Sequence, residues 1–359
     1  MKKLYYPILK TRDAELRAMK HLSDGVLQHI CPIYELTKSR KTTKVPDGDI
    51  HRRMKVIEEI QGDKEFILDL STDETYSNSQ INQLLSPYHG FGDWFYFIVE
   101  NYRNLNIIPT VHIYEDESGF SEEVSKFVKK ISQIKTKLAL RLPHDLDAGD
   151  ILVYLHPVVE AMDERCKLIL IFDAGHVTEA DCAKVIGSLT DSCEAVEQLF
   201  DRLESIVVAS SSFPSDVKAL GGHDAEGDFA ILEEGIYLAV KESCPAVECG
   251  DYASINTEQI EMRGGTFVPR VDIVTEDCNR FVYKRYRRDD GSYPKCARQM
   301  LKDARYQGEN GWWSNHEIRS ASQDLPNGIS PAYWISVRVD YYINMKTKRR
   351  IEELALPER

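Results

Sequence analysis

The chain has 359 residues, of which 42% are hydrophobic and 29% are charged, and its formal net charge is −13. These proportions are ordinary for a globular protein. The acidic balance argues against non-specific nucleic-acid binding, because phosphate neutralisation supplies most of that affinity and requires a basic face. No run of about 18 apolar residues occurs, so we expect no membrane span.

The eight cysteines are scattered through the chain. None forms a Cys-x-x-Cys pair, and no histidine pair lies at zinc-finger spacing. The first residues lead directly to Pro7 without the apolar segment of a secretory signal peptide. We therefore expect reduced thiols and a cytoplasmic protein.

Eight apolar runs of strand length recur through the first two thirds of the chain. Several are almost continuous in Ile, Leu and Val, which is typical of strands that are buried on both faces of a parallel sheet. The runs cover residues 6–9, 31–36, 66–70, 107–113, 138–142, 168–172, 206–209 and 247–252.

Segments with helical spacing lie between several of these runs. In residues 120–134, for example, Val124, Phe127, Val128 and Ile131 recur at the spacing of one helix face. The predicted helices cover residues 14–22, 120–134, 178–189, 194–203 and 228–240.

This order of strands and helices predicts an α/β protein built from parallel βα units. A closed barrel and an open doubly wound sheet both fit it. We favour a TIM-like (β/α)8 barrel over residues 1–254, because eight units match its strand count and no Gly-x-Gly-x-x-Gly motif follows a strand.

The pattern changes after about Ser254. Residues 267–274, 280–287 and 334–343 alternate polar and apolar, which is typical of half-exposed strands. Residues 255–359 are therefore predicted to form a mixed, largely β extension that packs on the barrel. Its charged tail, residues 346–359, is expected to be loose.

Polar residues stand at or just after the ends of most predicted strands. A barrel has its active site at the carboxyl ends of its strands, so these side chains are expected to converge. Lys10, Glu35 and His112 are the candidate catalytic residues, with His112 as acid or base. Glu35, Asp69 and Asp173 are candidate oxygen ligands for a divalent cation such as Mg²⁺.

Three further residues are candidates for ligand binding, namely Arg12, Arg141 and Asp251. Together with Lys10, the two arginines could hold an anion such as a phosphate. This set suits hydrolysis of a phosphoester, with a nucleotide or another small phosphoester as the ligand.

A purely structural interpretation stands beside the functional one. Ionised groups at strand ends need partners, and barrels contain salt bridges there for stability alone. Glu35 with Lys10, and Asp69 with Arg141, could be such neighbouring ion pairs.

Two segments near the start of the chain are distinctive, Tyr-Pro-Ile-Leu-Lys-Thr-Arg at residues 6–12 and Ile-Cys-Pro-Ile-Tyr-Glu-Leu at residues 30–36. Gly-Asp-Tyr follows at residues 250–252, with weaker matches at Trp313-Ser314 and Trp334. In these motifs the chain resembles the beta protein family of temperate phages, phage satellites and bacterial defence islands.

The resemblance implies a genetic context rather than a reaction. Members of that family lie in small phage-borne operons, beside a toxic protein called Gop and a small regulator. They are associated with restraint of the toxic protein and with antiviral defence. No established reaction or catalytic residue comes with the family, so the site predicted above rests on the residues alone.

Two functions therefore stay open. The first is a defence component that restrains a toxic partner protein from the same operon. The alternative is a metal-dependent hydrolase or phosphodiesterase that acts on a nucleotide or small phosphoester. The two are compatible, because a defence component can be an enzyme.

Overall fold

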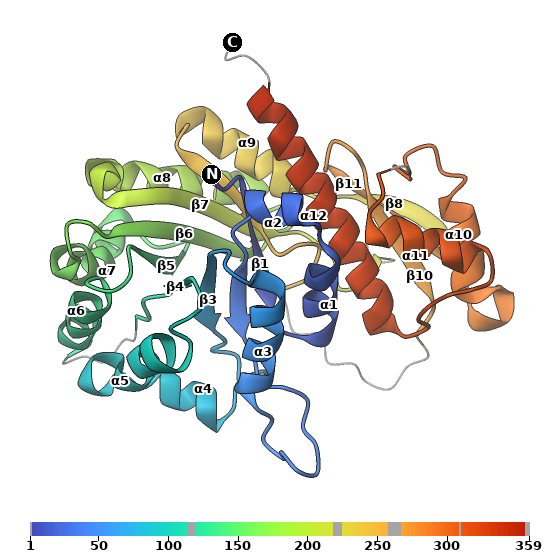
Figure 1. Cartoon of the computed structure of the whole chain (residues 1–359). Helices are drawn as coiled ribbons and strands as arrows, with labels where there is room; N and C mark the ends of the chain where they lie inside the picture. Colours follow the sequence, from blue (N-terminus) through green and yellow to red (C-terminus); the bar gives the residue numbers. More distant parts are fainter. Residues whose placement is uncertain (1, 114–118, 218–224, 258–266, 309, 356–359) are drawn as a thin grey trace.

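A computed structural model describes residues 2–113, 119–217, 225–257, 267–308 and 310–355. Its centre is an eight-stranded parallel sheet in the order β4-β3-β2-β1-β9-β7-β6-β5 (Figure 1). The strands are β1 (Tyr5–Lys10), β2 (Ile33–Leu36), β3 (Phe66–Leu70), β4 (Ile107–Pro109), β5 (Lys137–Pro143), β6 (Lys167–His176), β7 (Leu203–Ser211) and β9 (Val247–Asp251).

The two edge strands, β4 and β5, meet and close the sheet into a barrel. The Val111 backbone N–H donates to the Ala139 carbonyl at 2.7 Å, and Thr110 forms a parallel bridge with Ala139. This closure confirms the predicted TIM-like barrel and excludes the open sheet. Each of the eight apolar runs overlaps one of the barrel strands.

Helices cover the outside of the barrel (Figure 1). The strands alternate, so that Phe66, Leu68 and Leu70 of β3 pack outward against the helices while Ile67 packs inside the barrel. The helical elements of this layer are α1 (Asp13–His21), α2 (Asp24–His29), α3 (Ile50–Gln61), α4 (Ser79–Leu84), α5 (Tyr88–Tyr96), the π-helical turn η1 (Phe97–Asn101), α6 (Phe120–Ile131), α7 (Ala148–Ala161), α8 (Cys182–Ala195), the 3-10 turn η2 (Glu197–Arg202) and α9 (Glu233–Ser243).

A second, antiparallel sheet lies beside the barrel. It has the order β10 (Arg270–Val274), β11 (Arg280–Arg285) and β8 (Glu226–Ala230). β8 occupies part of the segment 228–240 that was predicted to be entirely helical, so that prediction is wrong at its start. The chain division at residue 254 stays a prediction, and β8 pairs with β11 across it.

The rest of the extension is helical, with the short turn η4 (Arg288–Asp290), α10 (Ser292–Met300), α11 (Trp313–Ser322) and the long α12 (Pro331–Ala355). The predicted strand at 334–343 is wrong, because these residues belong to α12. The helix packs against α1, β10 and α11, and it is buried on several sides, so its apolar residues do not mark a single stripe.

The expectation of a loose tail is also wrong for residues 346–355. Lys346 and Arg350 are buried within α12, where they form ion pairs with the barrel. The eight cysteines are free thiols. Within the ranges that the structure describes, no helix combines the length and apolarity that crossing a bilayer requires.

Candidate functional site

Strand alternation brings the last inward-facing residue of several strands to one end of the barrel. Ile67 and Ile171 point into the barrel core, and Asp69 and Asp173 follow each of them by two residues. Lys10, Glu35 and Arg141 follow the inward residues of β1, β2 and β5 in the same way. Neighbouring strands are in register here, with Lys10 opposite Glu35 and Glu35 opposite Asp69.

All of these polar residues except Lys10 line a cavity of about 800 Å³ at the carboxyl ends of the strands. We call this cavity, together with the adjoining Lys10, the polar mouth. This is the end at which barrel enzymes bind their substrates. Among its lining residues are Glu35, Asp69, His112, Arg141, His144 and Asp173.

Arg141 lies at the centre of the polar mouth. Its Nη1 donates to Asp69 at 3.0 Å and to Glu35 at 3.4 Å. Its Nε and Nη2 donate to Asp173 Oδ2 at 2.9 Å and 2.7 Å. Nη2 also donates to the Tyr252 hydroxyl at 2.7 Å, and this hydroxyl in turn donates to Asp173 at 2.5 Å.

The charges around Arg141 keep its guanidinium protonated. Burial lowers the pKa of Arg141, but the Tyr252 hydroxyl and the Asp173, Asp69 and Glu35 carboxylates raise it, and the raised direction prevails. Burial also raises the pKa of Tyr252, so its hydroxyl keeps the proton that it donates. Arg141 is thus a permanent cation whose donors are already occupied by carboxylates.

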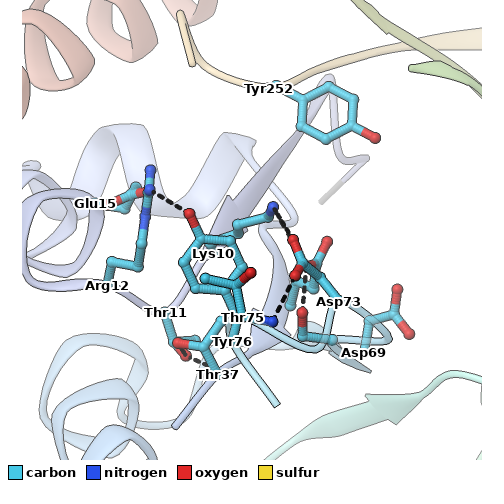
Figure 2. A network of polar contacts seen from close by, with 12 residues as sticks. Lys10, Thr11, Arg12, Glu15, Thr37, Asp69, Asp73, Thr75, Tyr76 and Tyr252 are labelled. Carbon is cyan, nitrogen blue, oxygen red and sulfur yellow. Dashed lines mark hydrogen bonds and ion pairs between the residues drawn. The ribbon is translucent and has the colours of Figure 1, made fainter. Parts of the chain in front are cut away.

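Lys10 lies beside this cluster (Figure 2). Its Nζ is 3.9 Å from Glu35 and 4.0 Å from Asp73, and it stands 4.5 Å from the centre of the Tyr76 ring. Glu35 also accepts a hydrogen bond from Ser71 Oγ at 3.0 Å. Lys10 is therefore held by two long ion pairs and by the face of the Tyr76 ring, and these separations are too short for a ligand atom to lie between Lys10 and the carboxylates.

Arg12 points away from the polar mouth. Its guanidinium pairs with Glu15 and donates to the Tyr76 hydroxyl at 3.2 Å (Figure 2). Arg12 is not among the residues that line the cavity. The structure therefore does not bring it together with Lys10 and Arg141 as an anion clamp.

His112 lines the cavity at the end of β4. Its Nδ1 lies 3.9 Å from Asp69, and its Nε2 has no hydrogen-bond partner among the described residues. Trp94 and Phe91 enclose the ring, with centroids 5.4 Å and 6.2 Å away. Burial lowers the pKa of His112 and Asp69 raises it less, so the imidazole is neutral near pH 7.

Phe91, one of the two aromatic residues beside His112, belongs to an unusual backbone turn. His89, Gly90 and Phe91 all have positive φ, of 59°, 66° and 48°. At Gly90 a side chain is excluded, because an added Cβ would lie 2.7 Å from Lys126 Cβ. Backbone of this kind is often found near functional sites.

Asp251, predicted to bind a ligand, is not part of the polar mouth. It faces outward from β9, where it accepts a hydrogen bond from Tyr342 at 2.9 Å and lies 3.5 Å from Lys346, both on α12. It also accepts from the Tyr5 hydroxyl. Its role in the structure is to join the barrel to α12.

The predicted metal ligands, Glu35, Asp69 and Asp173, do converge, but on the Arg141 cation. Among the residues described, no group of three or more His, Cys, Asp and Glu side chains is arranged to hold a metal ion. The divalent-cation site stays a prediction, and binding there would require Arg141 to move from between the carboxylates.

Sequence reasoning missed Tyr252, Ser71 and Asp73. The signal for Tyr252 was available, since the inward side of β9 includes Gly250 and the next inward position is 252, not 251. Ser71 and Asp73 follow β3 in a loop, where no periodic pattern predicts the direction of a side chain.

The family model described as Beta protein matches residues 5–347. A curated similar sequence is "Protein beta" of Enterobacteria phage P4, which is 27% identical over 346 residues and aligns with 95% of this chain and 92% of that protein.

Two solved structures also align with the chain. They are the spore cortex-lytic enzymes SleL of Bacillus cereus, with 8% identity and a TM-score of 0.30, and of Bacillus megaterium, with 10% identity and a TM-score of 0.25. Each alignment covers 95% of this chain and 74% of the other. TM-scores this low carry no argument about function.

Proposed function

Because this chain belongs to the Beta protein family, we propose that it is a component of a phage- or prophage-borne locus, where it restrains a toxic partner protein and serves antiviral defence. The similar phage sequence extends over nearly the whole of both proteins, which supports a shared role for the entire chain. The polar mouth is the proposed working site.

The observation that favours regulated binding over metal chemistry is the position of Arg141. Its donors are occupied by Glu35, Asp69 and Asp173, so a resident cation already lies between the carboxylates where a metal ion would bind. An anionic ligand would have to compete with three carboxylates for this one guanidinium.

The charge of the polar mouth favours a particular kind of ligand. Its carboxylates, Glu35, Asp69 and Asp173 in the lining and Asp73 beside Lys10, exceed the cations Arg141 and Lys10, and His112 is neutral. Carboxylates accept hydrogen bonds, so the site suits a small molecule that donates through hydroxyl or ammonium groups. The cavity of about 800 Å³ has the size of a small-molecule site.

Co-expression tests the restraint. The neighbouring toxic protein is induced in a host with and without this chain, and growth is followed. The proposal predicts that growth recovers when the chain is present. Unaltered toxicity would refute it.

A second candidate is the hydrolase or phosphodiesterase, and His112 is the observation that favours it. A neutral imidazole that lines a cavity beside Asp69 is placed to act as an acid or base. An activity screen with aryl phosphodiesters, with and without Mg²⁺, tests it. Turnover that disappears in His112→Gln would support the enzyme, and no turnover under either condition would refute it.

A further inference from the structure

A second large cavity lies at the opposite end of the barrel, which we call the lysine mouth. Its volume is about 1010 Å³, and it is lined by residues around the amino-terminal ends of β1, β3, β4 and β5. Five lysines line it but only three acidic residues, in a chain whose formal net charge is −13. They are Lys2, Lys3, Lys64, Lys135 and Lys137, with Asp63, Glu65 and Glu204.

The nearby acids are largely used by three of these lysines. Lys137 lies between Glu65 at 3.1 Å and Glu204 at 3.0 Å. Lys2 pairs with Glu248 at 2.7 Å, and Lys64 pairs with Asp24 at 3.0 Å. None of these ion pairs involves Lys3 or Lys135, although the carboxylate of Asp63 also lines the cavity.

Lys3 and Lys135 have only carbonyl partners among the residues that the structure describes. Lys3 Nζ donates to the Gln28 carbonyl at 3.1 Å, and Lys135 Nζ donates to the Leu105 carbonyl at 3.5 Å. Burial lowers the pKa of Lys135, and no acidic group offsets this. A partly desolvated ammonium without a counter-charge is costly, and a bound anion would remove that cost.

Helix dipoles give an alternative explanation for some of these lysines. Gln28 is near the end of α2 and Lys64 follows α3, and cations are favourable at helix carboxyl ends. This does not explain Lys135, whose Nζ reaches a carbonyl in the loop before β4.

We propose that the lysine mouth binds a small phosphate-bearing molecule with at least two negative charges, held chiefly by Lys3 and Lys135. An ammonium is a compact charge that suits phosphate oxygens, and the cavity is large enough for a small molecule. This site is separate from the polar mouth and does not depend on the function proposed for it.

Calorimetric titration of the full chain with inorganic pyrophosphate tests this site. The wild type binds, and raising the salt concentration weakens the binding. Lys135→Met weakens it at least tenfold and Lys3→Met at least threefold, whereas Lys135→Arg, which keeps the charge, stays within threefold of wild type.

Lys20→Met is the matched control. Lys20 is exposed and pairs with Glu59 outside the cavity, so its loss should change the affinity less than twofold. Absence of pyrophosphate binding to the wild type, or full affinity in Lys135→Met, would overturn the proposal. The Lys135→Arg variant separates lost charge from a disturbed fold.

Discussion

Arg141 donates two hydrogen bonds to a single oxygen of Asp173, from Nε at 2.9 Å and from Nη2 at 2.7 Å. The same guanidinium reaches β2 and β3 through Glu35 and Asp69. One side chain therefore links four strands at the polar mouth, and its removal should affect both stability and ligand binding.

Replacing Arg141 tests this central position. Arg141→Met leaves three carboxylates in a confined site without their cation, and loss of one partner from a buried ion pair costs about 3–5 kcal/mol. Urea unfolding should show a free energy of unfolding lower by that amount. Arg165→Met, at an exposed arginine that pairs with Asp163, is the control and should change it by less than about 1 kcal/mol. Equal effects in the two variants would contradict the central role of Arg141.

Tyr252→Phe removes only the hydroxyl that connects Arg141 and Asp173. We expect a loss of about 1–3 kcal/mol in the free energy of unfolding, because two buried hydrogen bonds are lost, each worth about 0.5–1.5 kcal/mol. Tyr306→Phe is a matched control, since the Tyr306 hydroxyl is buried without a hydrogen-bond partner among the described residues. A comparable loss in the control would show that the Tyr252 hydroxyl has no special contribution.

The ion pairs that hold α12 on the barrel give a pH dependence. Burial raises the pKa of Glu234, but Lys346 and Arg350 overcome this and lower it from 4.5 to about 2. A carboxyl group with a lowered pKa stabilises the folded state at pH values above its pKa in the unfolded chain. This stabilisation is lost as the pH falls towards its pKa in the folded state. The stability advantage of wild type over Glu234→Gln, measured by urea unfolding, should therefore shrink between pH 5 and pH 3.

Lys346→Met examines the same contact from the other side. Lys346 is fully buried with Glu234 at 2.7 Å, so its loss should cost about 3–5 kcal/mol. Lys348→Met, two positions along α12 and more exposed, is the control and should have a small effect.

For the pH dependence, the contradicting outcome is a stability advantage of wild type over Glu234→Gln that does not vary with pH. The ion pair would then not be the source of the stability.

Asp340 should behave in the opposite way. Burial raises its pKa from 3.8 to about 6, although a hydrogen bond from the Ser314 backbone N–H opposes this. A raised carboxyl pKa destabilises the folded state at high pH. Asp340→Asn should therefore be more stable than wild type by about 3 kcal/mol at pH 8, and the difference should disappear below about pH 3. Thermal unfolding at the two pH values checks this, and a less stable variant at pH 8 would contradict it.

Much of the barrel was predictable, because strands buried on both faces give continuous apolar runs. Helix α3 was missed, although Ile50, Met54, Ile57 and Ile60 recur at helical spacing. α12 was mistaken for a strand because it is enclosed on several sides. Its polar residues are satisfied by tertiary partners, such as Arg338 by Asp272, that no local pattern indicates.

The candidate site was predictable to the extent that side-chain direction follows strand alternation. Lys10, Glu35, Asp69, Arg141 and Asp173 converge as expected. Asp251 and Arg12 do not, because strand ends alone do not specify which face a residue occupies. Arg141 fills the space between the carboxylates because of the distances across the barrel. The sequence does not contain these distances, so this position of Arg141 was not predictable.

The most direct test of the account combines the polar mouth with the proposed restraint. Growth is measured while the toxic protein of the proposed locus is induced with wild type, His112→Gln, Lys10→Met or the surface control Lys20→Met, all at matched protein levels. The account predicts that wild type and Lys20→Met restore growth and that both polar-mouth variants fail. Full rescue by His112→Gln and Lys10→Met would contradict it.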